Sequence, residues 1–155
     1  MRDEIRLAFL GFGNVGRALA RLLEAKRTHL HTAYGLQTRV VGIATGRHGA
    51  LLRPEGLDAR RAAEAVEAGR SLDGSDASRC ADSEAFLRAV QADVLLESVP
   101  VNYHTGQPAL GWIEAALGRG MHVVSANKGP VVHGYRRLTD LARQRGVHYL
   151  FESAV

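Results

Sequence analysis

Two short motifs carry the residue types in this sequence that could bind a phosphorylated ligand and act on it. The first motif is Gly11-Phe12-Gly13-Asn14-Val15-Gly16. The second is Ala126-Asn127-Lys128-Gly129-Pro130, which follows a short apolar run. Glycine-rich turns let backbone N–H groups approach phosphate oxygens, and a lysine ammonium can bind a ligand oxygen or relay a proton. Together the two motifs predict a dinucleotide site with a lysine directed into it.

The three glycines of the first motif each have an expected physical role. Gly11 permits a tight turn out of a strand, Gly13 lets the backbone approach a pyrophosphate, and Gly16 allows close packing of the next helix. A predicted strand over residues 5–10 precedes the motif, and a predicted helix begins at Asn14. Phosphates would then meet the positive amino end of that helix. We therefore expect all six residues of the motif to contact the cofactor, rather than to form a purely structural turn.

The end of the second predicted strand, residues 39–44, bears on the choice of cofactor. An NAD site usually has an acidic residue there, which binds the ribose 2′-hydroxyl. This chain has Thr45 and Arg47 instead, and its next acid is Glu55. A guanidinium can hold a 2′-phosphate through two parallel hydrogen bonds. The sequence favours NADP, with Thr45 and Arg47 among the binding residues; NAD and a merely solvated Arg47 remain the alternatives.

Lys128 is the predicted catalytic residue and also a predicted cofactor contact. It follows a buried strand, and partial burial in the tight turn around it would suit it to proton relay; a solvent-facing loop lysine is the alternative. Glu97 ends another strand, and its carboxylate is expected either to accept from loop amides or to face the ligand. Ser98 and Val99 follow Glu97 and are predicted to lie against the cofactor.

Short strands rich in β-branched residues alternate with helical segments along the whole chain. This pattern predicts an α/β fold with a Rossmann-type doubly wound, mainly parallel sheet and helices on both faces. The expected strands are residues 5–10, 39–44, 93–97, 122–125 and 148–151, and the expected helices are residues 14–30, 58–68, 83–89, 107–118 and 131–145. Residues 45–57 are expected to form a loop, whereas residues 71–81 are ambiguous and could contain a short strand.

Composition limits the class of protein. The 155 residues, 46% of them hydrophobic and 23% charged, suit one globular domain over residues 1–155. A net charge of +4 raises the question of nucleic acid, but the arginines are dispersed and predict no nucleic-acid partner. No segment reaches the roughly 20 apolar residues of a membrane span. The single cysteine, Cys80, excludes an internal disulfide and predicts a cytoplasmic protein.

Five segments, taken in order, resemble the amino-terminal, cofactor-binding half of homoserine dehydrogenase. They are L-G-F-G-N-V-G (10–16), D-V-L-L-E-S (93–98), T-G-Q-P-A (105–109), H-V-V-S-A-N-K-G-P (122–130) and G-V-H-Y-L-F-E-S-A-V (146–155). The resemblance implies NAD(P)-dependent interconversion of aspartate 4-semialdehyde and homoserine, in threonine and methionine biosynthesis. It also implies that the glycine motif holds the pyrophosphate, that Ser98 lies beside the cofactor, and that Lys128 contacts it and assists the chemistry.

The same resemblance implies a monovalent-cation site, usually for sodium, to which Glu152 and Val155 contribute. The family continues past the position of Val155 into a substrate and dimerisation domain. We therefore expect this chain to bind the dinucleotide without turning over aspartate 4-semialdehyde or homoserine alone, and we expect oligomerisation mainly through the missing domain.

Two other classes of protein stay open at this point. One is a non-catalytic Rossmann-type module that senses a nucleotide or binds a partner. The other is a related oxidoreductase, such as an aspartate dehydrogenase or a dihydrodipicolinate reductase. Those enzymes would share the glycine motif, but the turn from Ala126 to Pro130 is not expected in them.

Overall fold

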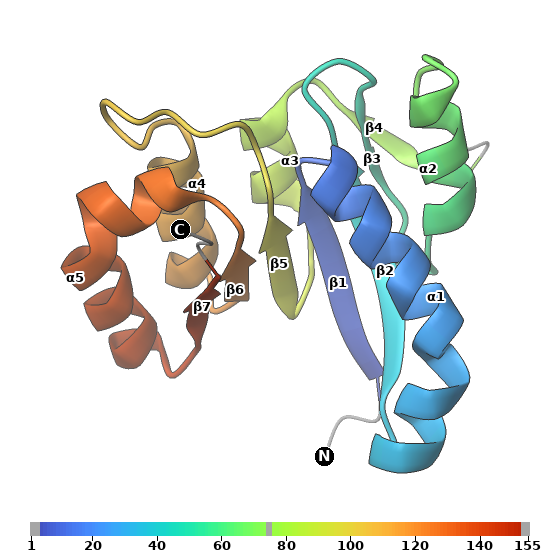
Figure 1. The fold of residues 1–155 in the computed structure, drawn as a ribbon, viewed down its shortest axis with the longest axis horizontal. Helices are drawn as coiled ribbons and strands as arrows, with labels where there is room; N and C mark the ends of the chain where they lie inside the picture. The colour runs from blue at the N-terminus through green and yellow to red at the C-terminus, as the bar shows by residue number, and fades with distance from the viewer. Residues whose placement is uncertain (1–3, 74–75, 153–155) are drawn as a thin grey trace.

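The computed structural model describes residues 4–73 and 76–152 of the chain (Figure 1). The strands are β1 (Glu4–Leu10), β2 (Gln37–Ala44), β3 (Ala50–Leu52), β4 (Ser78–Cys80), β5 (Val94–Glu97), β6 (His122–Ser125) and β7 (Tyr149–Phe151). The helices are α1 (Asn14–Tyr34), α2 (Ala59–Glu67), α3 (Ser83–Ala89), α4 (Ala109–Gly118) and α5 (Lys128–Arg145).

The strands form one sheet in the order β4-β3-β2-β1-β5-β6-β7. The five strands from β2 through β1 and β5 to β7 run parallel, and β3 lies antiparallel between β2 and β4. Successive connections from β1 lead first to β2 on one side and later to β5 on the other. The carboxyl end of β1 is therefore the point where strand order reverses, which is where doubly wound folds bind ligands. The predicted Rossmann-type, mainly parallel sheet is confirmed.

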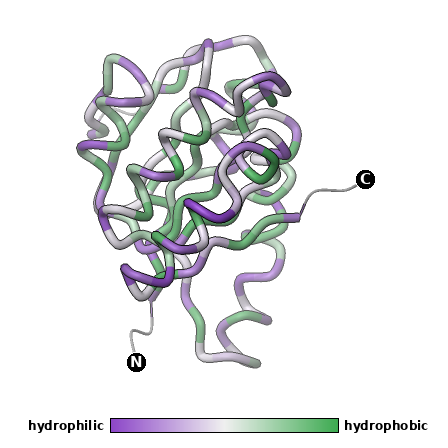
Figure 2. Tube along the Cα trace, turned by 90° about the vertical axis from the view of Figure 1, so that its left-hand side faces the viewer, coloured by the Kyte–Doolittle hydropathy of each residue, from purple (hydrophilic) through white to green (hydrophobic). Residues whose placement is uncertain are grey.

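Helices cover both faces of the sheet, as predicted. Alternate side chains of a strand point to opposite faces, so Phe9 packs with α1 and α2 whereas Ala8 and Leu10 pack with the other three helices. Figure 1 shows α1 and α5 lying over different parts of the sheet. The tube in Figure 2 alternates between hydrophilic and hydrophobic residues along its helices. This alternation is typical of helices with one buried face and one solvated face.

The prediction of a loop over residues 45–57 is wrong in its middle. Three residues there form β3, which pairs antiparallel with β2 through Ile43 and Leu51. Glycine and proline on both sides dominate the local pattern, but the buried Leu51 secures the strand through tertiary packing. The ambiguous segment at residues 71–81 does contain a strand, β4, which pairs with β3.

The start of α5 also differs from the prediction. The helix was expected from Val131 but begins at Lys128, because the side chain of Asn127 caps it and accepts a hydrogen bond from the N–H of Gly129 at 3.0 Å. Pro130 fits in the first turn, where its missing N–H has no intrahelical partner. The earlier start moves Lys128 from a loop onto a helix terminus.

Two polar side chains near helix starts accept hydrogen bonds from backbone N–H groups. Asp58 caps α2 and accepts from the N–H of Arg61 at 2.9 Å. The hydroxyl of Thr105 accepts from the N–H of Gln107 at 3.2 Å, two residues before α4 begins. Thr105 therefore does not cap α4 and closes a turn within the preceding loop.

Candidate dinucleotide site

Parallel pairing brings the predicted site residues to one edge of the sheet. Leu10 at the end of β1 lies opposite Ala44 and Glu97, and Glu97 lies opposite Ser125. The residues that follow each strand end are consequently neighbours in space. The N–H of Gly11 donates to the carbonyl of Ala44 at 3.0 Å, which joins the glycine motif to the end of β2.

The glycine motif has the shape expected of a phosphate-binding turn. Gly11 has a φ of +89°, and a Cβ there would lie 2.7 Å from the carbonyl carbon of Ser98. A Cβ on Gly16 would lie 2.9 Å from the carbonyl oxygen of Gly11. Gly13 precedes the first turn of α1 and has no atom within 4 Å of its Cβ position. The turn is thus closely packed behind the motif and open at the glycine expected to approach the pyrophosphate.

The other residues of the motif divide between core and solvent. Phe12 is buried and packs edge-on against Phe9 with ring centroids 5.2 Å apart, so only its backbone can face a ligand. Asn14 and Val15 are exposed at the start of α1. The side chain of Phe12 therefore anchors the turn, while the helix start stays accessible.

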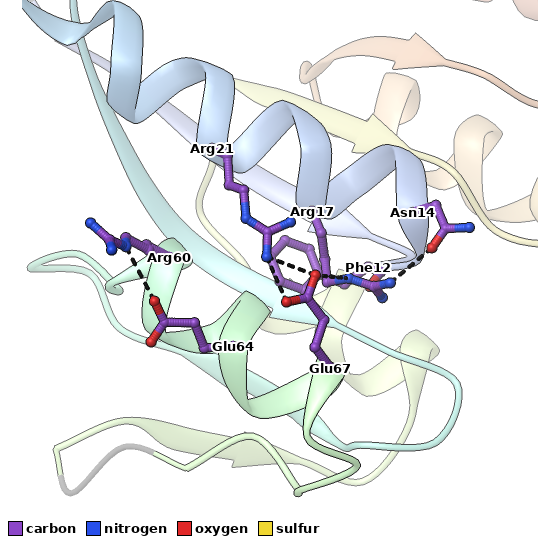
Figure 3. Close-up of polar contacts among 7 residues, drawn as sticks. All are labelled: Phe12, Asn14, Arg17, Arg21, Arg60, Glu64 and Glu67. Atoms are coloured by element: carbon purple, nitrogen blue, oxygen red, sulfur yellow. Dashed lines mark hydrogen bonds and ion pairs between the residues drawn. The ribbon is translucent and has the colours of Figure 1, made fainter.

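Arg17 supports the motif from the first turn of α1 and was not identified from the sequence. Its guanidinium donates to the carbonyl of Phe12 at 3.1 Å and to Oδ1 of Asn14 at 2.8 Å (Figure 3). Its Nε lies 3.4 Å from Oε1 of Glu67 at the end of α2. The same oxygen accepts a hydrogen bond from Arg21 at 2.7 Å. These bonds connect the glycine motif to α2. No local sequence pattern links Arg17 to a residue so distant along the chain.

The loop after β2 presents Arg47 to solvent. The hydroxyl of Thr45 donates to the carbonyl of Gly49 at 3.0 Å and accepts from the N–H of His48 at 2.7 Å. The Thr45 hydroxyl is thus used within its own loop. Arg47 is exposed and has no hydrogen-bond or ion-pair partner among the residues that the structure describes. Its guanidinium is available to a ligand.

Ser98 and Val99 lie beside the glycine motif. The N–H of Ser98 donates to the carbonyl of Leu10 at 2.9 Å, and its hydroxyl donates to the carbonyl of Gly11 at 3.1 Å. Val99 is half-buried. The loop after β5 is therefore attached directly to the turn after β1. Both segments are predicted to contact the cofactor.

Lys128 is exposed at the first position of α5. Within residues 4–73 and 76–152 its ammonium has no hydrogen-bond or ion-pair partner. The partial burial expected for this lysine is not present in the domain as described. A bound ligand or another part of a protein would have to cover it.

Glu97 takes the first of its two proposed roles and accepts from loop amides. Its side chain is 2% exposed. Oε1 accepts from the N–H of Val99 at 2.9 Å and from Nδ2 of Asn127 at 3.1 Å, and Oε2 accepts from the hydroxyl of Ser125 at 2.5 Å. Burial raises the pKa of Glu97, and these three hydrogen bonds oppose that rise. The result is a buried acid among neutral donors.

The predicted cation ligands stay a prediction. Glu152 is exposed, and its N–H donates to the carbonyl of Ser125 at 3.3 Å; Val155 lies outside the described residues. No group of three or more His, Cys, Asp or Glu side chains in the described part of the chain is placed to hold a metal ion. Across the same residues, no helix is long and apolar enough to cross a membrane.

A glycine turn at the point where a parallel sheet reverses its strand order defines the class of protein: this is a Rossmann-type nucleotide-binding domain. A family model described as "Homoserine dehydrogenase, NAD binding domain" matches residues 11–152. The chain belongs to this family.

Curated relatives agree with the family match. An NAD(+)-dependent homoserine dehydrogenase from Pseudomonas canavaninivorans is 34% identical over 153 residues, which are 98% of this chain and 44% of that protein. A homoserine dehydrogenase from Methanocaldococcus jannaschii is 34% identical over 150 residues, or 96% of this chain and 44% of that protein. The chain spans less than half the length of these relatives.

Solved structures show the same fold. A hyperthermophilic archaeal homoserine dehydrogenase in complex with NADPH has a TM-score of 0.80 at 26% identity, over 97% of this chain and 44% of that one. A putative homoserine dehydrogenase from Archaeoglobus fulgidus has a TM-score of 0.76 at 29% identity, over 95% of this chain and 42% of that one.

Proposed function

We propose that this chain binds a nicotinamide dinucleotide across the carboxyl ends of β1, β2, β5 and β6. The observation that carries this proposal is the turn from Gly11 to Gly16, which is closely packed behind and open at Gly13. The first N–H groups of a helix have no intrahelical partner and attract anions. The pyrophosphate would lie at Gly13, against the amino end of α1.

The cofactor we assign is NADP, on the basis of Arg47. One relative is named an NAD(+)-dependent enzyme and one related structure contains NADPH, so both cofactors occur among similar proteins. In this chain the loop after β2 offers an unpaired guanidinium and no carboxylate before Glu55. A guanidinium donates two parallel hydrogen bonds to a 2′-phosphate. It cannot replace the carboxylate that accepts from the ribose 2′-hydroxyl in an NAD site.

The relatives are named homoserine dehydrogenases, and the reaction we propose is the one that the resemblance implies, the interconversion of aspartate 4-semialdehyde and homoserine. The bound dinucleotide gives or takes a hydride at its nicotinamide ring. The residues of this chain hold and orient it: the glycine motif at the pyrophosphate, Ser98 and Val99 along the cofactor, and Lys128 at its reactive end. We propose that the domain alone binds the cofactor and needs a substrate-binding region for turnover.

The proposal is tested by calorimetric titration of the chain with NADPH and NADH. Gly13→Ala is the informative variant, because its Cβ meets no protein atom yet projects into the space assigned to the pyrophosphate. We expect the variant to keep its unfolding free energy within about 1 kcal/mol and to bind NADPH at least about tenfold more weakly. Unchanged binding by Gly13→Ala, or no binding of either cofactor by the wild type, would contradict the proposed site.

The cofactor preference has its own variant. Arg47→Ala should weaken NADPH binding about tenfold through the lost 2′-phosphate contact and leave NADH binding unchanged. Arg60→Ala removes the same charge from α2, where Arg60 is exposed and bonds to Glu64, and serves as the matched control. Equal affinity of the wild type for both cofactors would refute the role of Arg47 and leave the site itself intact.

A further inference from the structure

The buried carboxylate of Glu97 connects the segments that make up the proposed site. One oxygen accepts from the N–H of Val99 and from the amide of Asn127, and the other accepts from the hydroxyl of Ser125. The same Asn127 amide group donates to the carbonyl of Val99 at 3.3 Å. Glu97 thus links the loop after β5 to the segment between β6 and α5.

The connection continues in two directions toward the expected ligand. Next to Glu97, the hydroxyl of Ser98 donates to the carbonyl of Gly11, in the glycine motif. On the other side, Asn127 can point its Oδ1 at the N–H of Gly129 only while its Nδ2 faces Glu97, since the two atoms belong to one planar amide. The direction of this amide determines where α5 begins, and hence where Lys128 stands.

A carboxylate suits this position because all three neighbours are donors. An ionised carboxylate has acceptor sites on both oxygens and no proton of its own to place. Nothing in these contacts neutralises its charge, and burial raises its pKa. An apolar side chain would avoid that cost but would leave the Ser125 hydroxyl and the Val99 N–H without this acceptor. The Asn127 amide would keep only its longer bond to the Val99 carbonyl. The acid is therefore kept for the geometry that it imposes.

We propose that Glu97 is a positioning residue of the dinucleotide site, which holds Val99 and Lys128 where they meet the nicotinamide end of the cofactor. This inference rests on the proposed function and deepens it. Glu97 itself is enclosed and contacts no ligand in this scheme. It acts through the Val99 backbone and through the cap formed by Asn127.

The competing interpretation is that Glu97 merely stabilises the end of β5. Asp93 provides the matched control, because it is an acid directly before the same strand, at its other end. Its carboxylate accepts from the N–H of Arg6 at 2.8 Å and from the guanidinium of Arg6 at 2.8 and 3.1 Å. Its removal weakens the fold at the edge of the sheet opposite the site.

The experiment compares Glu97→Ala, Glu97→Gln and Asp93→Ala in the whole chain. Each is titrated with NADPH under conditions where urea unfolding shows it fully folded. We expect Glu97→Ala to bind about tenfold more weakly, the equivalent of one to two lost hydrogen bonds, and Asp93→Ala to bind within about twofold of the wild type. Glu97→Gln should recover most of the affinity, because its carbonyl still accepts from Val99 and Asn127 while Ser125 can turn to accept from its amide.

A second measurement separates positioning from stabilisation and does not depend on Glu97→Ala being stable. Asn127→Ala removes the link to α5 while leaving Glu97 two of its donors. We expect Asn127→Ala alone to weaken NADPH binding several-fold. Added to Lys128→Ala, the same change should weaken binding clearly less, since residues that act through one another have non-additive effects.

The outcomes are distinguishable. Absence of NADPH binding by the wild type would refute the proposed function. Binding by the wild type together with equal affinity in Glu97→Ala and Asp93→Ala would refute only the positioning role. An equal effect of Asn127→Ala with and without Lys128 would show that the network does not act through this lysine, and would also overturn the inference.

Discussion

The two ends of β5 carry acids that are stabilised in opposite ways. Asp93, just before the strand, has a side chain that is 19% exposed and forms an ion pair with Arg6 at 2.8 Å. Glu97, the last residue of the strand, is 2% exposed, and its partners among the described residues are a backbone N–H, an amide and a hydroxyl. One carboxylate is balanced by a full opposite charge, and the other by neutral dipoles.

The difference shows what each edge of the sheet does. A partly exposed, bidentate ion pair contributes modestly to stability. A buried acid among neutral donors loses hydration free energy and is strongly destabilised if its partners change. At the carboxyl edge, next to the proposed ligand, substitution of the buried acid should therefore cost much stability. At the amino edge, substitution of the ion-paired acid should cost less.

Glu97→Leu should have the largest effect on stability of any change at either end of β5. It removes the acceptor of the Val99 N–H and of the Ser125 hydroxyl, and leaves the Asn127 amide only its longer bond to the Val99 carbonyl. We expect a loss of about 3–5 kcal/mol in the free energy of unfolding, measured by urea denaturation. A loss below about 1 kcal/mol would mean that the three donors find other partners, and the contrast between the two ends would disappear.

Asp93→Ala should cost less, about 1–2 kcal/mol. Arg6 keeps access to water after the change, because its side chain is 36% exposed. The same urea measurement repeated in molar potassium chloride should reduce the difference between wild type and variant, since salt screens an exposed ion pair. A difference that is insensitive to salt would show that Asp93 acts through its hydrogen bonds and not through its charge.

Glu97→Gln should change how stability depends on pH. Because burial raises the folded-state pKa of Glu97 above its ordinary 4.5, the stabilising contribution of the protonated acid is complete below pH 4.5 and is lost as the pH rises through the folded pKa. The variant lacks this loss. We expect the stability of the variant relative to the wild type to rise between pH 4.5 and pH 8.

Unfolding curves of both proteins in buffers across that interval measure this gain. Asp93→Asn, measured in parallel, is the control for a general effect of removing one carboxylate. Parallel pH profiles for wild type and Glu97→Gln would mean that Glu97 ionises inside the network without cost.

Tyr149→Phe should have the smallest effect. The Tyr149 hydroxyl is buried and makes no hydrogen bond with the residues that the structure describes. Burial raises the pKa of Tyr149 to about 12, and the charge of Glu97 adds to the rise. We expect a change within about 0.5 kcal/mol by thermal or urea unfolding. A loss above about 1 kcal/mol would show that Tyr149 belongs to the Glu97 network.

Most of the fold was predictable because its signals are local. The strand over residues 122–125 and the helix over residues 83–89 match the structure at both ends. β3 was not predictable, since three residues between glycines and a proline carry too little periodicity. Its pairing with β2 and β4 is a tertiary effect.

The candidate site was predictable in its parts and not in its connections. Gly11 and Gly16 revealed their structural roles through spacing, because turn geometry and close packing demand glycine whatever surrounds them. The role of Gly13 at a pyrophosphate stays a prediction. Arg17 left no such signal, because its partner Glu67 lies in another helix. Lys128 was located correctly after β6, but its exposure depends on what covers the start of α5.

The sequence by itself determined the order of the five helices and of the five parallel strands, the glycine turn and the types of side chain that end those strands. Those properties follow from backbone sterics and hydrophobic periodicity, which act over a few residues. Only the tertiary structure decided which of two roles Glu97 takes. Ser125 and Asn127 lie 28 and 30 residues beyond Glu97. They reach it because parallel pairing brings separate strand ends together, and a hydrogen bond forms only at that short range.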